Sequence, residues 1–118
     1  MSQCKVAVYG TLKDGHGNHH VMRYAGGSKI GETTITGATM FSYGAFPVIT
    51  LDGSKNKILI EVYDVKDLQP LDQLEGFPHF YSRSQVETEY GSAWIYHAPD
   101  ADVERIKANL EQVKSGIW

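Results

Sequence analysis

The chain has 118 residues, enough for one domain with a sizeable hydrophobic core, and we predict a single domain over residues 1–118. Apolar residues make up 42% of the sequence and charged residues 21%, with a formal net charge of −3, which is the composition of an ordinary globular protein. Because the 11 Lys and Arg residues form no basic run, this composition argues against nucleic acid as a partner.

The sequence has one cysteine, Cys4, which leaves no internal disulfide and no pair of thiolate zinc ligands. A cytoplasmic, reducing location is therefore expected. No segment approaches the roughly 20 apolar residues of a membrane span, and the first apolar run, residues 6–9, is too short for the core of a signal peptide. We expect no membrane partner.

Residues 5–20, KVAVYGTLKDGHGNHH, lead from a strand through a glycine-rich loop into a helix. Residues 5–9 are mostly apolar and predict a buried strand, which Gly10 ends. Asn18 suits the N-cap of a short helix over residues 19–24. This arrangement would place unpaired backbone N–H groups where an anion can approach closely. The plainer interpretation is that Gly10 only supplies a turn.

Further strands are predicted along the middle of the chain. Residues 28–50 are rich in Thr, Ile, Val, Phe and Tyr and are interrupted by glycine and proline, which indicates several short strands joined by turns. Residues 57–63, 83–88 and 92–97 are each predicted to form one strand, the last two around a turn.

Two more helices complete the prediction. Asp67 suits an N-cap, and Gly76 ends a helix whose apolar stripe is Leu68, Leu71 and Leu74. Asp102 suits the N-cap of a last helix with apolar positions spaced by three, four and three: Val103, Ile106, Leu110 and Val113. Strands predominate and the helices are dispersed, so the predicted class is α+β, a small curled sheet or β-barrel with flanking helices. The order of the strands is not predicted.

The glycine-rich loop fits neither a metal site nor a nucleotide site. Flanking glycines disfavour a helix through His16, so His16, His19 and His20 would not share one helix face as zinc ligands require. Gly10 and Gly15 have the spacing of a phosphate-binding loop, but His16 stands where that motif has its lysine. We expect no metal and no nucleotide there.

Glu75 is the candidate for acid–base chemistry. It is expected at the C-terminal end of the second helix, beside Leu74 of the apolar stripe. The negative end of the helix dipole and partial burial would both raise the pKa of this carboxyl. A carboxyl tuned toward neutrality can take up and return a proton at working pH. The plainer interpretation is a surface glutamate at a helix end.

Several short motifs follow one another in a fixed order. They are Tyr9-Gly10-Thr11-Leu12, Gly15 with Asn18-His19, Phe46-Pro47, Glu61-Val62-Tyr63, Leu71-Asp72 with Glu75, and then Tyr81 and Arg83. In this order the motifs resemble the gamma-glutamylcyclotransferase-like family, especially its gamma-glutamylamine cyclotransferase branch and its small single-domain bacterial and viral members. The resemblance covers nearly the whole chain, and the YGTL loop together with the LDxxE and YxR motifs is its most specific part.

The resemblance implies a small barrel with flanking helices and an enzyme with no metal and no organic cofactor. The implied reaction, an acyltransferase- or lyase-type intramolecular cyclisation, releases 5-oxoproline and a free amine from a gamma-glutamyl amide or amine. Glu75 is the implied general acid and base, and the implied substrate-binding residues are Tyr9, Gly10, Thr11, Leu12 and Tyr81. The protein would act on this small-molecule gamma-glutamyl substrate as a monomer or homodimer.

Three residues qualify this expectation. The family usually has glycine where this chain has Ile60, so a crowded strand beside the pocket is expected to limit substrate size. Asp72 and Glu61 are the alternatives to Glu75 as acid and base. Asp72 lies three positions from Glu75, and two such carboxylates would repel and raise one another's pKa.

The position of the other motif residues is also predicted. Tyr81 and Arg83 are expected near the rim of the pocket, because they begin the strand after the helix that carries Glu75; alternatively, Tyr81 is a core aromatic with its hydroxyl at the surface. The loop 9–12 is expected to bind an anion through its backbone N–H groups.

Two functions other than an enzyme stay open. One is a non-catalytic module that binds a small carboxylate or glutamyl ligand through the loop 9–12, and the other is an interaction protein with a vestigial pocket. The presence of Glu75 favours the enzyme, because a binding module needs no proton shuttle.

Overall fold

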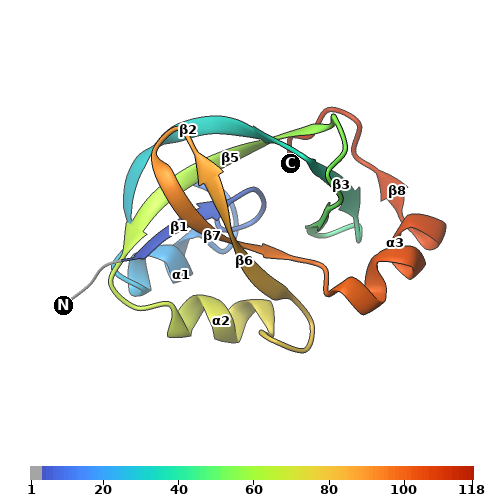
Figure 1. Cartoon of the computed structure of the whole chain (residues 1–118). Coiled ribbons are helices and arrows are strands. Elements are labelled where there is room, and N and C mark those ends of the chain that lie inside the picture. The colour runs from blue at the N-terminus through green and yellow to red at the C-terminus, as the bar shows by residue number, and fades with distance from the viewer. Residues whose placement is uncertain (1–3) are drawn as a thin grey trace.

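A computed structural model describes residues 4–118, which form eight β-strands, three α-helices and one short 3₁₀ helix (Figure 1). The strands are β1 (Cys4–Val8), β2 (Ser28–Thr36), β3 (Ala38–Ser42), β4 (Pro47–Leu51), β5 (Lys57–Val65), β6 (Ser82–Thr88), β7 (Gly91–His97) and β8 (Glu111–Gln112). The helices are α1 (His19–Tyr24), α2 (Gln69–Glu75) and α3 (Val103–Asn109), with the 3₁₀ helix at Asp100–Asp102. The predicted α+β class, a curled sheet with flanking helices, is confirmed.

Strand β1 lies at the centre of a five-stranded sheet with the order β2-β5-β1-β7-β6. It runs antiparallel to β5 and parallel to β7. Successive residues of a strand point to opposite faces, so Val6 and Val8 pack in one apolar core while Ala7 and Tyr9 pack in another. The glycine-rich loop therefore leaves the sheet from its middle strand.

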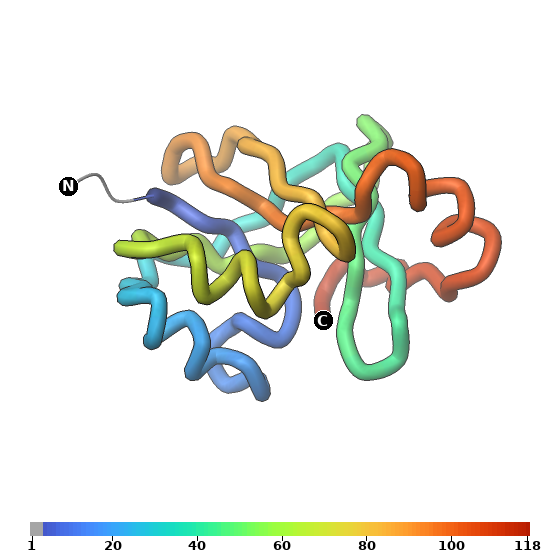
Figure 2. The backbone as a smooth tube through the Cα atoms, turned by 90° about the horizontal axis from the view of Figure 1, so that it is seen from below, coloured from blue at the N-terminus to red at the C-terminus, as the bar shows by residue number. Residues whose placement is uncertain are grey.

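A smaller sheet with the order β4-β3-β8 lies at the other end of the molecule. Figure 1 shows the long strands β2 and β5 arching toward it, with α1 and α2 beneath the larger sheet and α3 beside β8. Seen from below in Figure 2, the hairpin that joins β3 to β4 lies next to the chain that leaves α2. The cavity described below is bordered by this hairpin and by the end of α2.

Helix α2 is fixed by its apolar face and by both ends. Leu71 is completely buried in the core under the sheet, which contributes about 1.5–3 kcal/mol. The helix begins at Gln69, slightly later than predicted, and Asp67 Oδ1 accepts the Gln69 backbone N–H at 3.0 Å. Gly76 ends the helix with φ 65°, a left-handed conformation that glycine adopts without strain. These contacts hold Glu75, the last helical residue, in a defined place.

The other two helices start at the predicted positions, but the side chains at those positions do not cap them. Asn18 precedes α1, yet its Nδ2 donates to Thr11 Oγ1 at 2.9 Å and ties the loop to the helix. Asp102 precedes α3, yet it pairs with Arg105 at 3.6 Å. All three α-helices are short, and none within residues 4–118 is long and apolar enough to cross a lipid bilayer.

The last helix is shorter than its apolar periodicity predicts. The pattern extended to Val113, but α3 ends at Asn109 and the next residues form β8, which pairs antiparallel with β3. Val113 N–H then donates to the Met40 carbonyl at 2.8 Å. Ile106 is the one fully buried residue of α3. Pairing with β3 therefore satisfies the backbone where a longer helix would have added little burial.

Candidate active site

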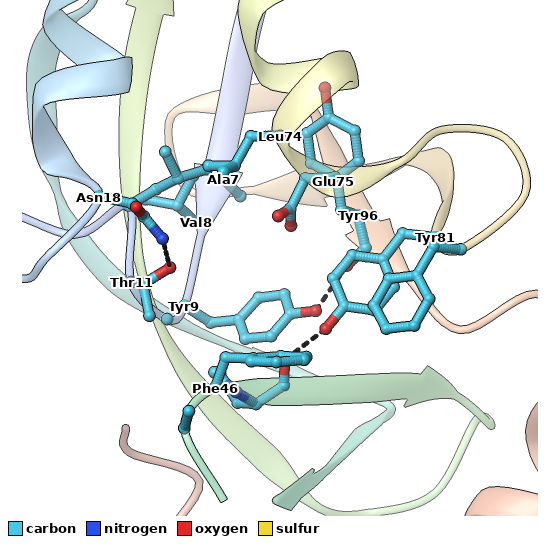
Figure 3. A pocket seen from close by; sticks show the side chains of 15 residues that line it. Ala7, Val8, Tyr9, Thr11, Asn18, Phe46, Leu74, Glu75, Tyr81 and Tyr96 are labelled. Carbon is cyan, nitrogen blue, oxygen red and sulfur yellow. Dashed lines mark hydrogen bonds between the residues drawn. The ribbon is translucent and has the colours of Figure 1, made fainter. Parts of the chain in front are cut away.

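A cavity of about 330 Å³ lies between the loop after β1, the β3–β4 hairpin, the end of α2 and the chain before β6 (Figure 3). The lining includes all six residues that the sequence predicted for the site: Tyr9, Gly10, Thr11, Leu12, Glu75 and Tyr81. Four segments that are distant in sequence thus converge on one space with apolar walls and a few polar groups, which is the usual character of a small-molecule site.

The carboxyl of Glu75 points into this cavity from the end of α2 (Figure 3). Within residues 4–118, no hydrogen bond or ion pair reaches its oxygens, and burial raises the pKa of the carboxyl to about 7. Both protonation states are then populated at neutral pH. A carboxyl in this state can accept a proton and can also donate one.

The loop 9–12 faces Glu75 with unused backbone donors. Gly10 carbonyl accepts the Lys13 N–H at 3.0 Å, and Thr11 carbonyl accepts the Asn18 N–H at 2.9 Å, so the loop is closed by its carbonyls. The backbone N–H groups of Gly10, Thr11 and Leu12 have no acceptor among residues 4–118. A run of free N–H groups in a turn is suited to an anion or a developing oxyanion.

Glycine at position 10 is required by a close approach rather than by an unusual backbone angle. A Cβ there would lie 2.6 Å from Pro47 Cγ and 2.8 Å from Pro47 Cδ, both far inside contact distance. Pro47 begins β4 on the opposite wall of the cavity. Gly10 therefore lets the loop and the hairpin meet, in addition to providing the turn that the sequence predicted.

Two tyrosine hydroxyls are fixed in the cavity by backbone carbonyls (Figure 3). Tyr9 Oη donates to the Tyr96 carbonyl at 2.9 Å, and Tyr81 Oη donates to the Pro47 carbonyl at 2.7 Å. Burial, and to a lesser degree the charge of Glu75, raises the pKa of both hydroxyls. Tyr81 is buried and lines the cavity, so the alternative of a hydroxyl at the surface is wrong, and its place near the rim stays a prediction.

Asp72, one alternative to Glu75 as acid and base, is already paired with Arg83. Arg83 Nε donates to Asp72 Oδ1 at 2.9 Å, and Tyr96 Oη donates to the same oxygen at 2.6 Å. The Arg83 guanidinium also lies over two aromatic rings, 4.4 and 4.5 Å from their centroids, those of Phe77 and Trp94. Arg83 is therefore part of this buried network rather than of the pocket rim. Burial, and not the expected repulsion by Asp72, raises the pKa of Glu75.

Glu61, the other alternative, is outside the cavity lining and is occupied by hydrogen bonds. Its Oε1 accepts the Asp14 N–H at 2.8 Å and the Tyr63 hydroxyl at 2.7 Å, and its Oε2 lies 3.4 Å from Lys29 Nζ. Burial alone would raise the pKa of Glu61, but these hydrogen bonds and the Lys29 charge lower it below its ordinary value. Glu61 thus anchors the far end of the glycine-rich loop as a permanent carboxylate.

Ile60 does not crowd the cavity as expected. Its side chain is completely buried in the core that also holds Met40 and Ile49, and it is not part of the cavity lining. Ile60 lies on the core-facing side of β5, and Glu61 on the opposite face, so neither side chain lines the cavity. The departure from the family at this position therefore does not narrow the pocket.

Of the histidines near the loop, His19 has structural contacts. His19 Nδ1 lies 2.9 Å from the Leu12 carbonyl oxygen, and its ring centroid is 5.8 Å from that of Tyr63. His19 therefore braces the loop 9–12 from behind. In the part of the chain from residue 4 onward, no group of three or more His, Cys, Asp or Glu side chains is placed to hold a metal ion.

The cavity is also lined by residues that the sequence did not single out, chiefly Tyr96 and Phe80, and by Leu74, which was predicted only as part of the apolar stripe of α2. Tyr96 reaches the site because β7 runs parallel to β1, so that the ends of both strands meet at one edge of the sheet. Alternation in residues 92–97 predicted the strand but gave no signal of its partner. Phe80 is placed by the turn after α2, which no local pattern predicted.

Comparison with known proteins gives the family of the chain. Residues 6–118 match the family described as gamma-glutamyl cyclotransferase, AIG2-like. The chain is 31% identical over 117 residues to the gamma-glutamylcyclotransferase family protein YtfP of Escherichia coli K12, a match that covers 97% of this chain and 95% of YtfP.

Two solved structures have the same fold. An AIG2-like protein from Mus musculus superposes with a TM-score of 0.77 at 22% identity, over 97% of this chain and 88% of that one. The solution structure of YtfP from Escherichia coli gives a TM-score of 0.68 at 24% identity, over 97% and 95% of the two chains. Together with the family match over residues 6–118, these findings show that the chain belongs to the gamma-glutamyl cyclotransferase, AIG2-like family.

Proposed function

We propose that the protein is an enzyme that converts a gamma-glutamyl amide or amine into 5-oxoproline and a free amine, with Glu75 as general acid and base. Its family and the name of its relative YtfP support a gamma-glutamylcyclotransferase-like function. The observation that carries the specific reaction is the Glu75 carboxyl, which points into the cavity, has a pKa of about 7 and finds no partner among residues 4–118.

In this proposal the loop 9–12 holds the glutamyl end of the substrate. The free N–H groups of Gly10, Thr11 and Leu12 would donate to the substrate α-carboxylate or to the oxyanion that develops on the γ-carbonyl. The hydroxyls of Tyr9 and Tyr81 each donate a hydrogen bond to a backbone carbonyl, so the lone pairs of their oxygens can accept a hydrogen bond from the substrate α-ammonium.

The proposed chemistry needs one proton carrier and no water. The Glu75 carboxylate takes a proton from the substrate α-ammonium, and the resulting amine attacks the γ-carbonyl carbon. A C–N bond forms to close the five-membered ring, and the C–N bond to the leaving amine breaks. Glu75 gives the proton to the leaving nitrogen as that bond breaks. The restored carboxylate then takes the second proton of the attacking nitrogen, which becomes the lactam N–H, and passes it to the released amine, which leaves as an ammonium.

The cavity would also contribute by orientation. A flexible gamma-glutamyl chain must fold so that its α-nitrogen lies against its own γ-carbonyl, and a cavity of about 330 Å³ is at the small end of the range for ligand pockets, roughly 300–1,000 Å³. Holding such a folded conformer can lower the barrier by several kcal/mol.

The experiment that tests this proposal is a product assay. The purified protein is incubated with a panel of gamma-glutamyl amides that differ in the leaving amine, and 5-oxoproline is measured by mass spectrometry against enzyme-free controls. We expect time-dependent release of 5-oxoproline and the free amine in equal amounts. If no member of the panel is cleaved, the proposed reaction is wrong, and a module that binds a small carboxylate through the loop 9–12 becomes the better account.

A further inference from the structure

Three aromatic side chains form one cluster, which we term the aromatic collar: Tyr43, Phe46 and Phe80. Phe46 and Phe80 line the cavity, and Tyr43 packs against both. Ring centroids are 5.1 Å apart for Tyr43 and Phe46, 5.9 Å for Tyr43 and Phe80, and 6.1 Å for Phe46 and Phe80. Phe80 also stacks on Tyr81 with a centroid distance of 4.9 Å. The collar thus joins the β3–β4 hairpin to the chain after α2, the two segments that lie together in Figure 2.

The collar is incompletely buried although its members are large and apolar. Phe80 is 48% exposed, and the neighbouring Leu74 is 37% exposed, yet both line the cavity with Glu75. Phe80 is held in this place, because its N–H donates to the Gly76 carbonyl at 2.8 Å. Exposed apolar side chains that are fixed at the edge of a cavity indicate a surface that a ligand covers.

The direction of the leaving group follows from the proposed proton path. The leaving nitrogen must receive its proton from Glu75, while the glutamyl end is held by the loop 9–12 on the opposite side. The substituent on that nitrogen therefore extends to the side of Glu75 away from the loop, where Tyr81 lies (Figure 3) and Phe80 stacks on it.

The chemical character of this side of the cavity is apolar. The described lining includes no Lys, Arg or His, and Glu75 is its one acidic residue. An anionic substituent would therefore find no basic partner in the cavity lining, whereas a flat apolar group could stack on the Phe80 ring as Tyr81 already does.

We propose that the aromatic collar forms the subsite for the leaving amine, and that this subsite selects amines bearing a flat apolar group, such as arylalkyl amines. This inference rests on the proposed function, because the occupant is the amine half of a gamma-glutamyl substrate. It goes beyond that function by naming the residues that choose among amines.

The turnover test compares gamma-glutamyl benzylamide with gamma-glutamyl ethylamide. We expect the wild-type kcat/KM to favour the benzylamide by about tenfold, the size of effect that one aromatic contact gives. Phe80→Ala should reduce this preference to about twofold, chiefly through KM, and Phe80→Tyr, which keeps the ring, should restore it. Phe80→Leu replaces Phe80→Ala if that variant fails to fold, since it removes the ring but keeps apolar bulk.

The control is Tyr24→Ala, which removes an aromatic side chain that is 85% exposed on α1 and does not line the cavity. Its benzylamide preference should equal that of the wild type. A wild-type enzyme that favours the ethylamide, or a preference that Phe80→Ala and Phe80→Leu leave intact, would overturn the subsite while the proposed reaction stands.

A binding test separates the subsite from the reaction. The N-benzyl and N-ethyl monoamides of glutaric acid lack the α-amine and cannot cyclise, so their Kd values can be measured by calorimetry on the unmodified protein. We expect the benzyl amide to bind about tenfold more tightly, with the difference lost in Phe80→Ala. Equal Kd values would refute the subsite even if the enzyme is active. A clear benzyl preference in a protein that releases no 5-oxoproline would instead uphold the subsite and refute the proposed reaction.

Discussion

Two glutamates near the glycine-rich loop, the buried Glu61 and the partly buried Glu75, have opposite environments. Glu61 accepts three hydrogen bonds, from the Asp14 N–H, the Tyr63 hydroxyl and the Lys29 ammonium, and its pKa lies below the ordinary value. Glu75 accepts none from residues 4–118, and its pKa is raised to about 7. Burial acts to raise the pKa of both carboxyls, so burial alone does not decide the protonation state. The donors around each carboxyl decide it.

The comparison separates a structural carboxylate from a candidate reactive one. Both carboxylate oxygens of Glu61 have hydrogen-bond partners within the protein, so the surroundings of Glu61 need no ligand. The Glu75 region is incomplete, since a carboxyl, three backbone N–H groups and two tyrosine oxygens face the same cavity. A protein tends to lose stability where it keeps such groups unpaired for a ligand. This trade-off can be measured, and the following experiments change one region at a time.

The largest expected effect is the loss of turnover in Glu75→Gln. The amide keeps the shape of the carboxyl but cannot carry a proton in either direction, so 5-oxoproline formation should fall by about 10²–10⁴-fold. Steady-state kinetics with a gamma-glutamyl amide measure it, and Glu104→Gln on the exposed face of α3 is the matched control. Binding of substrate to Glu75→Gln should persist, because the lost interaction belongs to the transition state.

The pH dependence of the wild-type rate tests the protonation state of Glu75. In the wild type kcat/KM should fall as the pH drops below about 7, since the free enzyme then loses its carboxylate base. Turnover at wild-type rates in Glu75→Gln would refute the acid–base role. Asp72 is held by Arg83 and Glu61 lies outside the cavity, so such a result would point to a base supplied by the substrate itself.

The second effect is on stability, where Glu75→Gln should be more stable than the wild type above pH 7. Because the folded pKa of Glu75 is raised, the native state binds more protons than the unfolded chain between about pH 4.5 and 7. The contribution of Glu75 to the free energy of unfolding is most favourable below pH 4.5 and is lost as the pH rises through 7. At pH 8 the unfolding free energy of Glu75→Gln should exceed that of the wild type by about 3 kcal/mol. Urea unfolding at pH 5 and pH 8 measures it, and a variant no more stable than the wild type at pH 8 contradicts the burial argument.

The third effect is a loss of stability in Glu61→Gln, whereas Glu75→Gln should gain stability. Removing the charge weakens the hydrogen bonds from Asp14, Tyr63 and Lys29, and the expected loss is about 2 kcal/mol of unfolding free energy at pH 7. Since the folded pKa of Glu61 is lowered, this contribution is present above the unfolded pKa and disappears as the pH falls through the folded value. Denaturant unfolding at pH 7 and pH 3 should show the difference shrinking. An unchanged midpoint at pH 7 would mean that Glu61 does not anchor the loop.

Most of the fold could be predicted because its elements leave local signals. The strands of residues 57–63, 83–88 and 92–97 appeared within one or two residues of β5, β6 and β7. The error at the C-terminus has a tertiary cause: the residues after Asn109 keep a helical spacing of apolar side chains, but β3 offers them backbone partners. Strand pairing between distant residues has no local signature, which is why β8 and the strand order were not predicted.

The candidate site could be predicted only in part, for the same reason. The loop 9–12 and Glu75 belong to short motifs, and both line the cavity. The environment that sets the Glu75 pKa comes from distant chain segments, and the expected repulsion by Asp72 was wrong because Arg83 pairs with it across eleven positions. Phe80, which we propose contacts the leaving amine, stands in a turn whose geometry no periodicity reveals.

The smallest expected effects come from two matched tyrosines, one in each region. Tyr63 donates to the Glu61 carboxylate at 2.7 Å and Tyr81 donates to the Pro47 carbonyl at the same distance. A hydrogen bond to a charged group contributes about 1.5–3 kcal/mol and one between neutral groups about 1 kcal/mol. Tyr63→Phe should therefore lose more unfolding free energy than Tyr81→Phe, as thermal or urea unfolding at pH 7 would show.

Activity should rank these two variants in the reverse order. Tyr81→Phe removes an oxygen that faces the cavity, so KM for a gamma-glutamyl amide should rise several-fold, by the roughly 1 kcal/mol that one hydrogen bond contributes. Tyr63 does not line the cavity, and Tyr63→Phe should leave KM unchanged at a temperature where it is folded. If Tyr81→Phe alters neither kcat nor KM, Tyr81 does not contact the substrate and only supports the wall. The substrate α-ammonium would then have to be held by the hydroxyl of Tyr9 alone, which a Tyr9→Phe variant would show as the larger rise in KM.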